Sequence, residues 1–170
     1  MADRFARLPE RRAIIDRAGL WEALIEVGAA SDSIADKRAA VSRLLRAALD
    51  AGRAEIARRF ELAPTSGRAT AEAQAFLIDQ ILRLLHDFTV TYLYPTTNRS
   101  TGERLTIVAV GGYGRGEMAP HSDVDIGFLT PFKQTPWVEQ VIESILYSLW
   151  DLKLKVGHSS RSVDDMIRMA

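Results

Sequence analysis

Two short apolar runs enclose a glycine-rich segment, and this arrangement restricts the possible folds more than any other feature of the sequence. Residues 105–110 and 124–129 are rich in β-branched and apolar side chains, which predicts two buried strands. Pro136 then begins a helical repeat of apolar residues, and residues 152–156 alternate between apolar side chains and lysines, as a half-exposed strand would. The order strand, loop, strand, helix, strand predicts a small mixed sheet with a helix packed on it.

The part that precedes these strands has a different character, because the helix formers Ala, Leu, Arg and Glu dominate residues 9–95. Breaks near residues 28–33 and 63–67 divide it into separate helices. Ser33 is among the N-cap candidates for the helix that follows the first break. The β-prone residues 89–93 leave the end of the last of these helices open by several positions.

A turn-forming stretch at residues 94–102 is the clearest linker. We therefore expect an α+β chain with an N-terminal helical segment at residues 1–100 and a core with a small mixed sheet and packed helices at residues 101–170. Ser162 and Asp165 form the pattern of a capping box, and the apolar face of the helix they begin continues to the last residue. Because that helix lacks a stop signal, we expect the core to be truncated at its C-terminal end.

Charge and composition limit the classes of partner. Lysine plus arginine number 22 and aspartate plus glutamate also number 22, so no net field draws the chain to nucleic acid or to an anionic membrane. No apolar run approaches the roughly 18 residues that a membrane helix needs, and the first residues lack the apolar centre of a signal peptide. With no cysteine for disulfides or thiolate metal sites, we expect a cytoplasmic protein.

Two carboxylates are the first candidate site residues. Asp123 and Asp125 flank an apolar residue at the start of the second predicted strand, so alternation places them on the same face. Two such charges repel unless a cation lies between them, and Mg²⁺ suits carboxylate oxygens and completes its octahedron with waters and substrate phosphates. In isolation, the pair would more commonly be a solvated strand end.

The glycine-rich segment adds candidate phosphate ligands. Gly111 and Gly112 directly follow the first predicted strand, where missing side chains let backbone N–H groups approach phosphate oxygens, and Arg115 can add a fork of donors. An isolated Gly-Gly pair is more often an ordinary tight turn, but its position before two aspartates favours a site. A P-loop motif is missing, and the later glycines run into Pro120 without opening a dinucleotide-binding helix.

A third carboxylate is expected, because two metal ions that flank an in-line displacement need a shared set of ligands. Asp151 is the candidate, since we expect it to begin the third strand and return beside the first two. An equally common role for such a residue is a polar group that closes the preceding helix.

Two separated motifs resemble one known family. Residues 111–117, followed by Pro120 and by Ser122 with the two aspartates, resemble the nucleotidyltransferase motif of bacterial protein-PII uridylyltransferases, and residues 150–159 look like the next block of that family. The resemblance implies a polymerase-beta-type nucleotidyltransferase core. By the same resemblance the magnesium ligands are Asp123, Asp125 and Asp151, and the nucleotide-binding candidates are Gly111, Gly112, Arg115 and Ser122.

The implied reaction moves UMP from UTP to a tyrosine hydroxyl of the PII nitrogen-signalling protein with two Mg²⁺ ions, and Asp151 or a metal-bound water helps to remove the hydroxyl proton. No residue of the sequence identifies the base. Two alternatives stay open: a related transferase that uses ATP and another acceptor, or a nucleotide-binding module without turnover.

Overall fold

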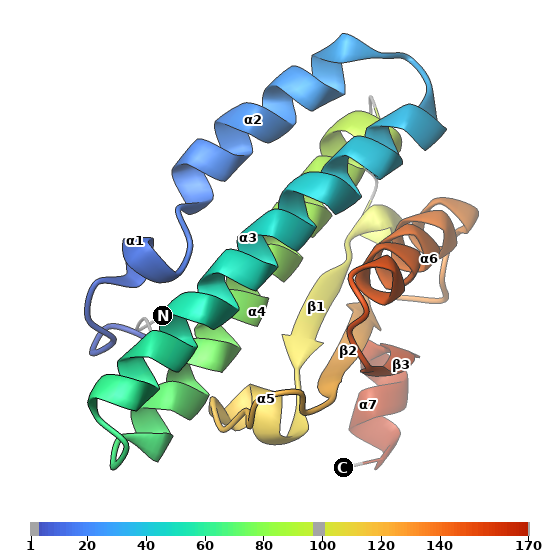
Figure 1. Cartoon of the computed structure of the whole chain (residues 1–170). Helices are drawn as coiled ribbons and strands as arrows, with labels where there is room; N and C mark the ends of the chain where they lie inside the picture. Colours follow the sequence, from blue (N-terminus) through green and yellow to red (C-terminus); the bar gives the residue numbers. More distant parts are fainter. Residues whose placement is uncertain (1–3, 97–100, 170) are drawn as a thin grey trace.

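The computed structural model describes residues 4–96 and 101–169 as a group of long helices beside a small sheet (Figure 1). The helical part contains α1 Arg11–Ile14, α2 Arg17–Ala30, α3 Ile34–Leu62 and α4 Gly67–Phe88. Both predicted breaks are therefore confirmed. So is the N-cap of α3, because the Ser33 hydroxyl accepts a hydrogen bond from the Asp36 amide at 3.3 Å.

The β-prone residues that follow α4 form a π-helical turn, η1 Thr89–Leu93. Thr89, Val90 and Leu93 are buried in this turn, so tertiary packing overrides their strand preference. Part of the predicted linker at 94–102 lies outside the described residues, and its last part begins the 3₁₀ turn η2 Thr101–Glu103.

Three strands form the mixed sheet, in the order β1-β2-β3. They are β1 Thr106–Ala109, β2 Val124–Thr130 and β3 Val156–Ser162. β1 pairs with β2 in antiparallel orientation, whereas β3 runs parallel to β2 after the crossover helix α6 Pro136–Asp151. The α+β class, the positions of the first two strands and the helix that begins at Pro136 are thereby confirmed. The expected burial is confirmed for β2 but wrong for β1, an edge strand in which no residue is buried and Val108 is 39% exposed.

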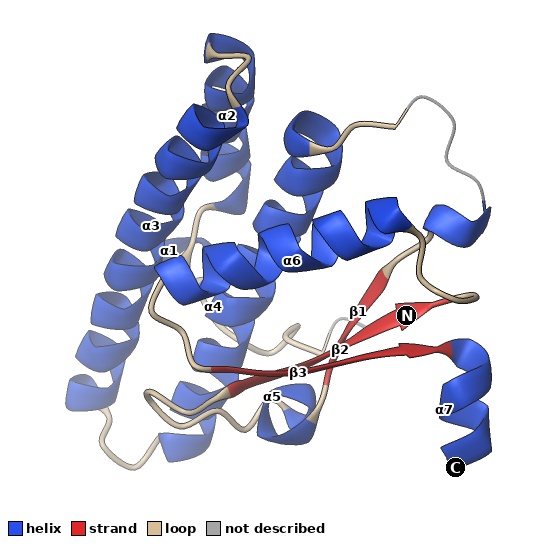
Figure 2. Cartoon of the chain, turned by 90° about the vertical axis from the view of Figure 1, so that its right-hand side faces the viewer, coloured by secondary structure: helices blue, strands red, loops and turns tan. Residues whose placement is uncertain are grey.

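The two faces of the sheet differ. Val124, Ile126 and Phe128 of β2 are buried, whereas Asp125 and Gly127 point to the opposite and more open face. Figure 2 shows α6 on one side of the sheet, with α5 Gly111–Arg115 and α7 Val163–Met169 on the other. One continuous core joins the helical part to the buried face, and it includes Leu77, Leu84 and Phe88 of α4, Ile126 and Phe128 of β2, and Ile145 and Leu149 of α6.

The predicted third strand at residues 152–156 is wrong, because β3 begins only at Val156. Leu152 and Leu154 are buried in a turn that ends α6, in which Lys153 has a φ of 55° and the Leu154 amide donates to the Leu149 carbonyl at 3.1 Å. A helix-ending turn has therefore produced the same apolar and polar alternation as a strand.

The start of α7 agrees with the predicted capping box. The Ser162 hydroxyl donates to the Asp165 carboxylate at 2.6 Å, and the Asp165 amide donates back to the Ser162 oxygen at 3.1 Å. The bond from the Ser162 hydroxyl, and after it one from the Ser162 amide at 3.4 Å, lower the pKa of the Asp165 carboxylate. Across the described residues, we find no helix with the length and apolar character needed to span a membrane.

Candidate functional site

Asp125 lies where all three strands come close. Its backbone carbonyl accepts a hydrogen bond from the Val110 amide, just after β1, at 3.0 Å. The neighbouring Val124 amide donates to the Lys155 carbonyl, just before β3, at 2.7 Å. Asp123 is exposed and directly precedes β2, whereas Asp125 is half-buried within it. The backbone around the carboxylate pair is thus fixed from both sides.

Two glycines enclose the Asp125 carboxylate. A Cβ atom added to Gly111 would lie 2.9 Å from Oδ2 of Asp125, and one added to Gly157 would lie 2.4 Å from Oδ1. Gly157 is the register partner of Asp125 across the β2–β3 pair. Both positions therefore need glycine for the carboxylate to occupy its place, and Gly111 also has a left-handed φ of 57°.

The glycine-rich segment is more regular than the predicted loop, because Gly111–Arg115 forms the short helix α5. Its first turn is closed by the Gly114 amide, which donates to the Val110 carbonyl at 2.8 Å. Gly116 ends the helix in a left-handed conformation, with a φ of 74°. Since Gly111 adjoins Asp125, the N–H groups of the first turn, which have no intrahelical acceptor, begin beside the carboxylate.

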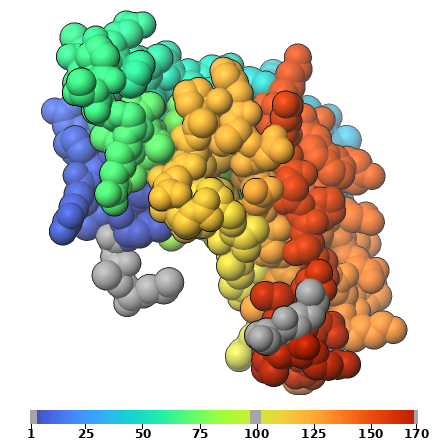
Figure 3. All heavy atoms as spheres, turned by 90° about the horizontal axis from the view of Figure 1, so that it is seen from below, coloured from blue at the N-terminus to red at the C-terminus, as the bar shows by residue number. Residues whose placement is uncertain are grey.

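Arg115 and Ser122 lie on the surface near this site. The Arg115 guanidinium pairs with the Glu117 carboxylate at 2.8 Å, and both side chains are exposed. Ser122 is exposed as well, and its amide donates to the Ala119 carbonyl at 3.1 Å. Figure 3 shows the surface of α5 and the loop that follows it, in yellow and light orange, open to solvent between the helical part and the β3–α7 part.

We expected Asp151 to begin the third strand, but it is instead the last residue of α6. Its carbonyl accepts a hydrogen bond from the Arg46 guanidinium of α3, and its side chain is exposed. α6 and the Asp125 carboxylate lie on opposite sides of the sheet. In the described parts of the chain, no three His, Asp or Glu side chains are grouped so that they could hold a metal ion.

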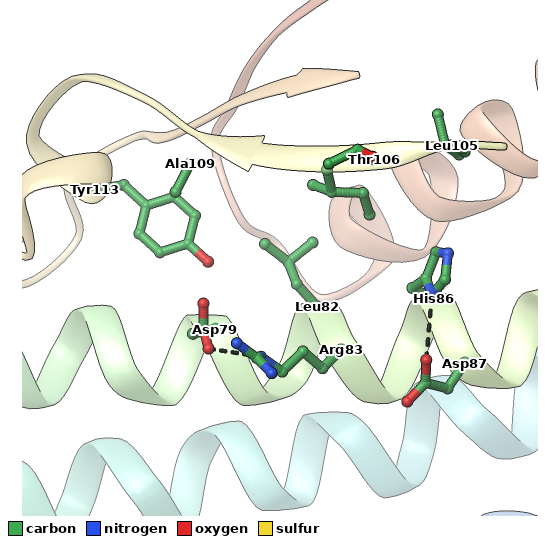
Figure 4. A pocket seen from close by; sticks show the side chains of 10 residues that line it. Asp79, Leu82, Arg83, His86, Asp87, Leu105, Thr106, Ala109 and Tyr113 are labelled. Carbon is green, nitrogen blue, oxygen red and sulfur yellow. Dashed lines mark hydrogen bonds and ion pairs between the residues drawn. The ribbon is translucent and has the colours of Figure 1, made fainter. Parts of the chain in front are cut away.

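Sequence reasoning missed two residues that shape the site. Gly157 adjoins the carboxylate only because of the β2–β3 register, although a glycine inside a strand is a recognised sign of a close approach. Tyr113 is 3% exposed and anchors α5 on the helical part. Its hydroxyl points toward Asp79 of α4, at one end of a cavity of about 290 Å³ between α4 and β1 (Figure 4).

The chain is similar to proteins of known families. Residues 97–168 match the family model described as a nucleotidyltransferase domain. The chain is 61% identical, over 96% of its length, to a bifunctional uridylyltransferase/uridylyl-removing enzyme of Novosphingobium aromaticivorans. The corresponding values are 49% over 96% for an enzyme of the same name from Rhodospirillum rubrum and 52% over 97% for one from Azospirillum brasilense. No solved structure gives a significant match.

The matched region contains α5, β2 and β3, and therefore the glycines and carboxylates described above. The chain spans 18% of the length of each of the three relatives. Along nearly its whole length the chain is thus similar to enzymes named bifunctional uridylyltransferase/uridylyl-removing enzyme, and its residues 97–168 carry a nucleotidyltransferase domain.

Proposed function

We propose that this site transfers UMP from UTP to a tyrosine hydroxyl of the PII signalling protein in the cytoplasm, with Asp123 and Asp125 as ligands of Mg²⁺. The observation that carries the proposal is the Asp125 carboxylate, which lies between Gly111 and Gly157 at the beginning of α5. The names of the relatives support uridylyl transfer. The PII acceptor comes from the resemblance of the motifs to that family.

The donor set fits magnesium. Mg²⁺ is commonly held by one or two carboxylates while substrate phosphates and waters complete its shell, so Asp123 and Asp125 are sufficient without Asp151. Such an ion, when bound, offsets charge on the phosphates and on the leaving pyrophosphate. Because Asp151 ends α6 on the other side of the sheet, we do not retain it as a ligand or as a proton acceptor.

The remaining residues have positioning roles in this proposal. The N–H groups of Gly111 and Gly112 at the start of α5 are donors for phosphate oxygens. Arg115 can exchange its exposed partner Glu117 for phosphate at little cost, since exposed ion pairs are weak. The acceptor hydroxyl then attacks the α-phosphorus, a bond forms between its oxygen and phosphorus, and the bond to pyrophosphate breaks. The hydroxyl proton leaves through exposed Asp123 or through water.

Asparagine variants of the two carboxylates test this function. We expect Asp123→Asn and Asp125→Asn each to reduce the affinity for Mg–UTP, measured by calorimetry, by more than about tenfold. The urea unfolding midpoint should stay equal or rise slightly, since one of two repelling charges is removed. Asp32→Asn, in the exposed turn between α2 and α3, is the matched control. Unchanged Mg–UTP affinity in both site variants would disprove the proposal.

The nucleotide and the acceptor need a separate measurement. Competition of ATP against UTP in the same calorimeter tests the base, and incorporation of radiolabelled UMP into purified PII tests the acceptor. Preference for ATP would favour the related transferase with another acceptor, whereas UTP binding without labelling of any PII tyrosine would favour the nucleotide-binding module without turnover.

A further inference from the structure

The C-terminal end of α5 is held by an arginine that is more than 100 residues away in the sequence. Nη1 of Arg4 donates to the Gly114 carbonyl at 2.9 Å and to the Tyr113 carbonyl at 3.3 Å. Carbonyls in the last turn of a helix need hydrogen-bond donors from outside the regular helical pattern. The N-terminal segment of the chain thus supplies a donor to the glycine-rich helix of the site.

Arg4 is itself fixed by several neighbours. Its Nη2 lies 3.6 Å from Oδ1 of Asp79 on α4. Its guanidinium carbon lies 4.5 Å from the ring centre of Phe5 and 5.5 Å from that of Tyr113. The side chain is 35% exposed. One guanidinium therefore contacts the long helix α4, two aromatic rings and the backbone of α5.

Asp79 has a central place in this arrangement. Its side chain is 18% exposed and pairs with Arg83 at 2.8 Å as well as with Arg4. Figure 4 shows that the Tyr113 hydroxyl also points toward it from α5. Burial, and after it the nearby charge of Asp79, raises the pKa of Tyr113, so the phenol stays neutral. α5 is thereby attached to α4 at two points, the Tyr113 side chain and the Arg4 guanidinium.

We propose that Arg4 is a positioning residue of the nucleotide site, an inference that rests on the proposed function. α5 contains five residues, and its other end begins at Gly111, next to the Asp125 carboxylate. A shift at the Gly114 end is therefore passed to the N–H groups of Gly111 and Gly112 within one helical turn. By holding the carbonyls at one end, Arg4 fixes the donors at the other.

Alanine and lysine variants of Arg4 in the complete chain test this role by two independent measurements. The first is hydrogen exchange of a peptide covering residues 110–118, which contains the amides of α5. We expect faster exchange there in Arg4→Ala, with unchanged exchange in a peptide from the first half of α4. The second is the affinity for Mg–UTP, which should fall about tenfold, the usual scale for a lost hydrogen bond from a charged group.

Arg4→Lys separates positioning from general stability. A single ammonium cannot reproduce the planar fork, but it can keep one carbonyl contact, so we expect about a threefold loss of Mg–UTP affinity. Arg68→Ala is the matched control, because Arg68 pairs with Glu72 at 3.1 Å on the exposed surface of α4. It should change neither measurement.

The outcomes distinguish the two proposals. Unchanged exchange at residues 110–118 in Arg4→Ala would overturn the positioning role, whatever the nucleotide result. Faster exchange with unaltered Mg–UTP affinity would show that Arg4 orders α5 without serving the site, and would also overturn it. If the unaltered chain binds no Mg–UTP, the proposed function fails and the link from Arg4 to a nucleotide site fails with it.

Discussion

Replacement of Gly157 by alanine should damage the site without unfolding the chain. The added Cβ would lie 2.4 Å from Oδ1 of Asp125, whereas ordinary contacts begin near 3.4 Å. The oxygen must therefore withdraw by about 1 Å, roughly half the Mg–O bond length that magnesium requires. Because this oxygen ends a short rotatable side chain, its withdrawal costs only about 0.5–1.5 kcal/mol.

The stability cost is further reduced by the unfolded state. Alanine leaves the unfolded chain fewer conformations than glycine does, and this stabilises the folded state by about 0.4–1 kcal/mol. The free energy of unfolding should therefore change by less than about 1 kcal/mol. The displaced carboxylate, in contrast, should lower the Mg–UTP affinity about 10- to 100-fold, which is the usual effect of mutating a residue that orients a metal ligand. That corresponds to about 1.4–2.7 kcal/mol of binding free energy.

Urea unfolding and calorimetric titration with Mg–UTP give the two quantities. Gly127→Ala is the matched control, because Gly127 lies two residues after Asp125 on the same face of β2, and an added Cβ there meets its nearest atoms at 3.9 Å. It should keep full affinity. Wild-type affinity in Gly157→Ala would refute the reasoning, and so would a loss of stability of several kcal/mol, since the backbone would then have moved instead of the carboxylate.

Three further changes have clear expected results. Gly111→Ala should cost about 1–2 kcal/mol of unfolding free energy in urea titrations, because the left-handed φ of 57° disfavours a Cβ. Tyr113→Phe should make the free energy of unfolding less sensitive to alkali. Burial raises the pKa of Tyr113, so above pH 10 the phenol ionises only in the unfolded wild type, whose free energy of unfolding then falls by about 1.4 kcal/mol per pH unit. Urea titrations of both proteins at about pH 8 and 11 would detect the smaller fall in the variant. Glu55→Gln should make the thermal midpoint depend less on pH in acid. Hydrogen bonds from Arg58 and Arg59 lower the pKa of Glu55 from 4.5 to about 2, so in the wild type their contribution to stability is lost as pH falls through this interval. Equal slopes in wild type and variant would contradict either pH prediction.

Local signals in the sequence were sufficient for much of the fold. The hydroxyls of Ser33 and Ser162 cap their helices as the sequence patterns indicate, because a cap involves atoms only three residues apart. The first two strands are apolar enough to be recognised by composition. β3 was missed because it is an edge strand of Gly, His, Ser and Arg, largely exposed, whereas the buried leucines before it belong to a turn.

The site depends more on contacts between distant residues. The two aspartates and Gly111 are recognisable because they lie within one short segment. Gly157 acquires its role only from pairing with Asp125, and Arg4 reaches α5 across 110 positions. No local pattern encodes such contacts, since they exist only after α4 and the sheet have packed together. The predicted placement of Asp151 was wrong for a related reason, because the position of this residue depends on where α6 ends.

The continuous core has a consequence for how the chain can be divided. The family match begins at residue 97, after α4, yet Ile126 and Phe128 are each only 1% exposed within a core to which Leu84 and Phe88 of α4 also belong. A protein that began at the family boundary would present this face of the sheet to water and should aggregate or stay molten. The segment that the family model matches is therefore smaller than the unit that folds.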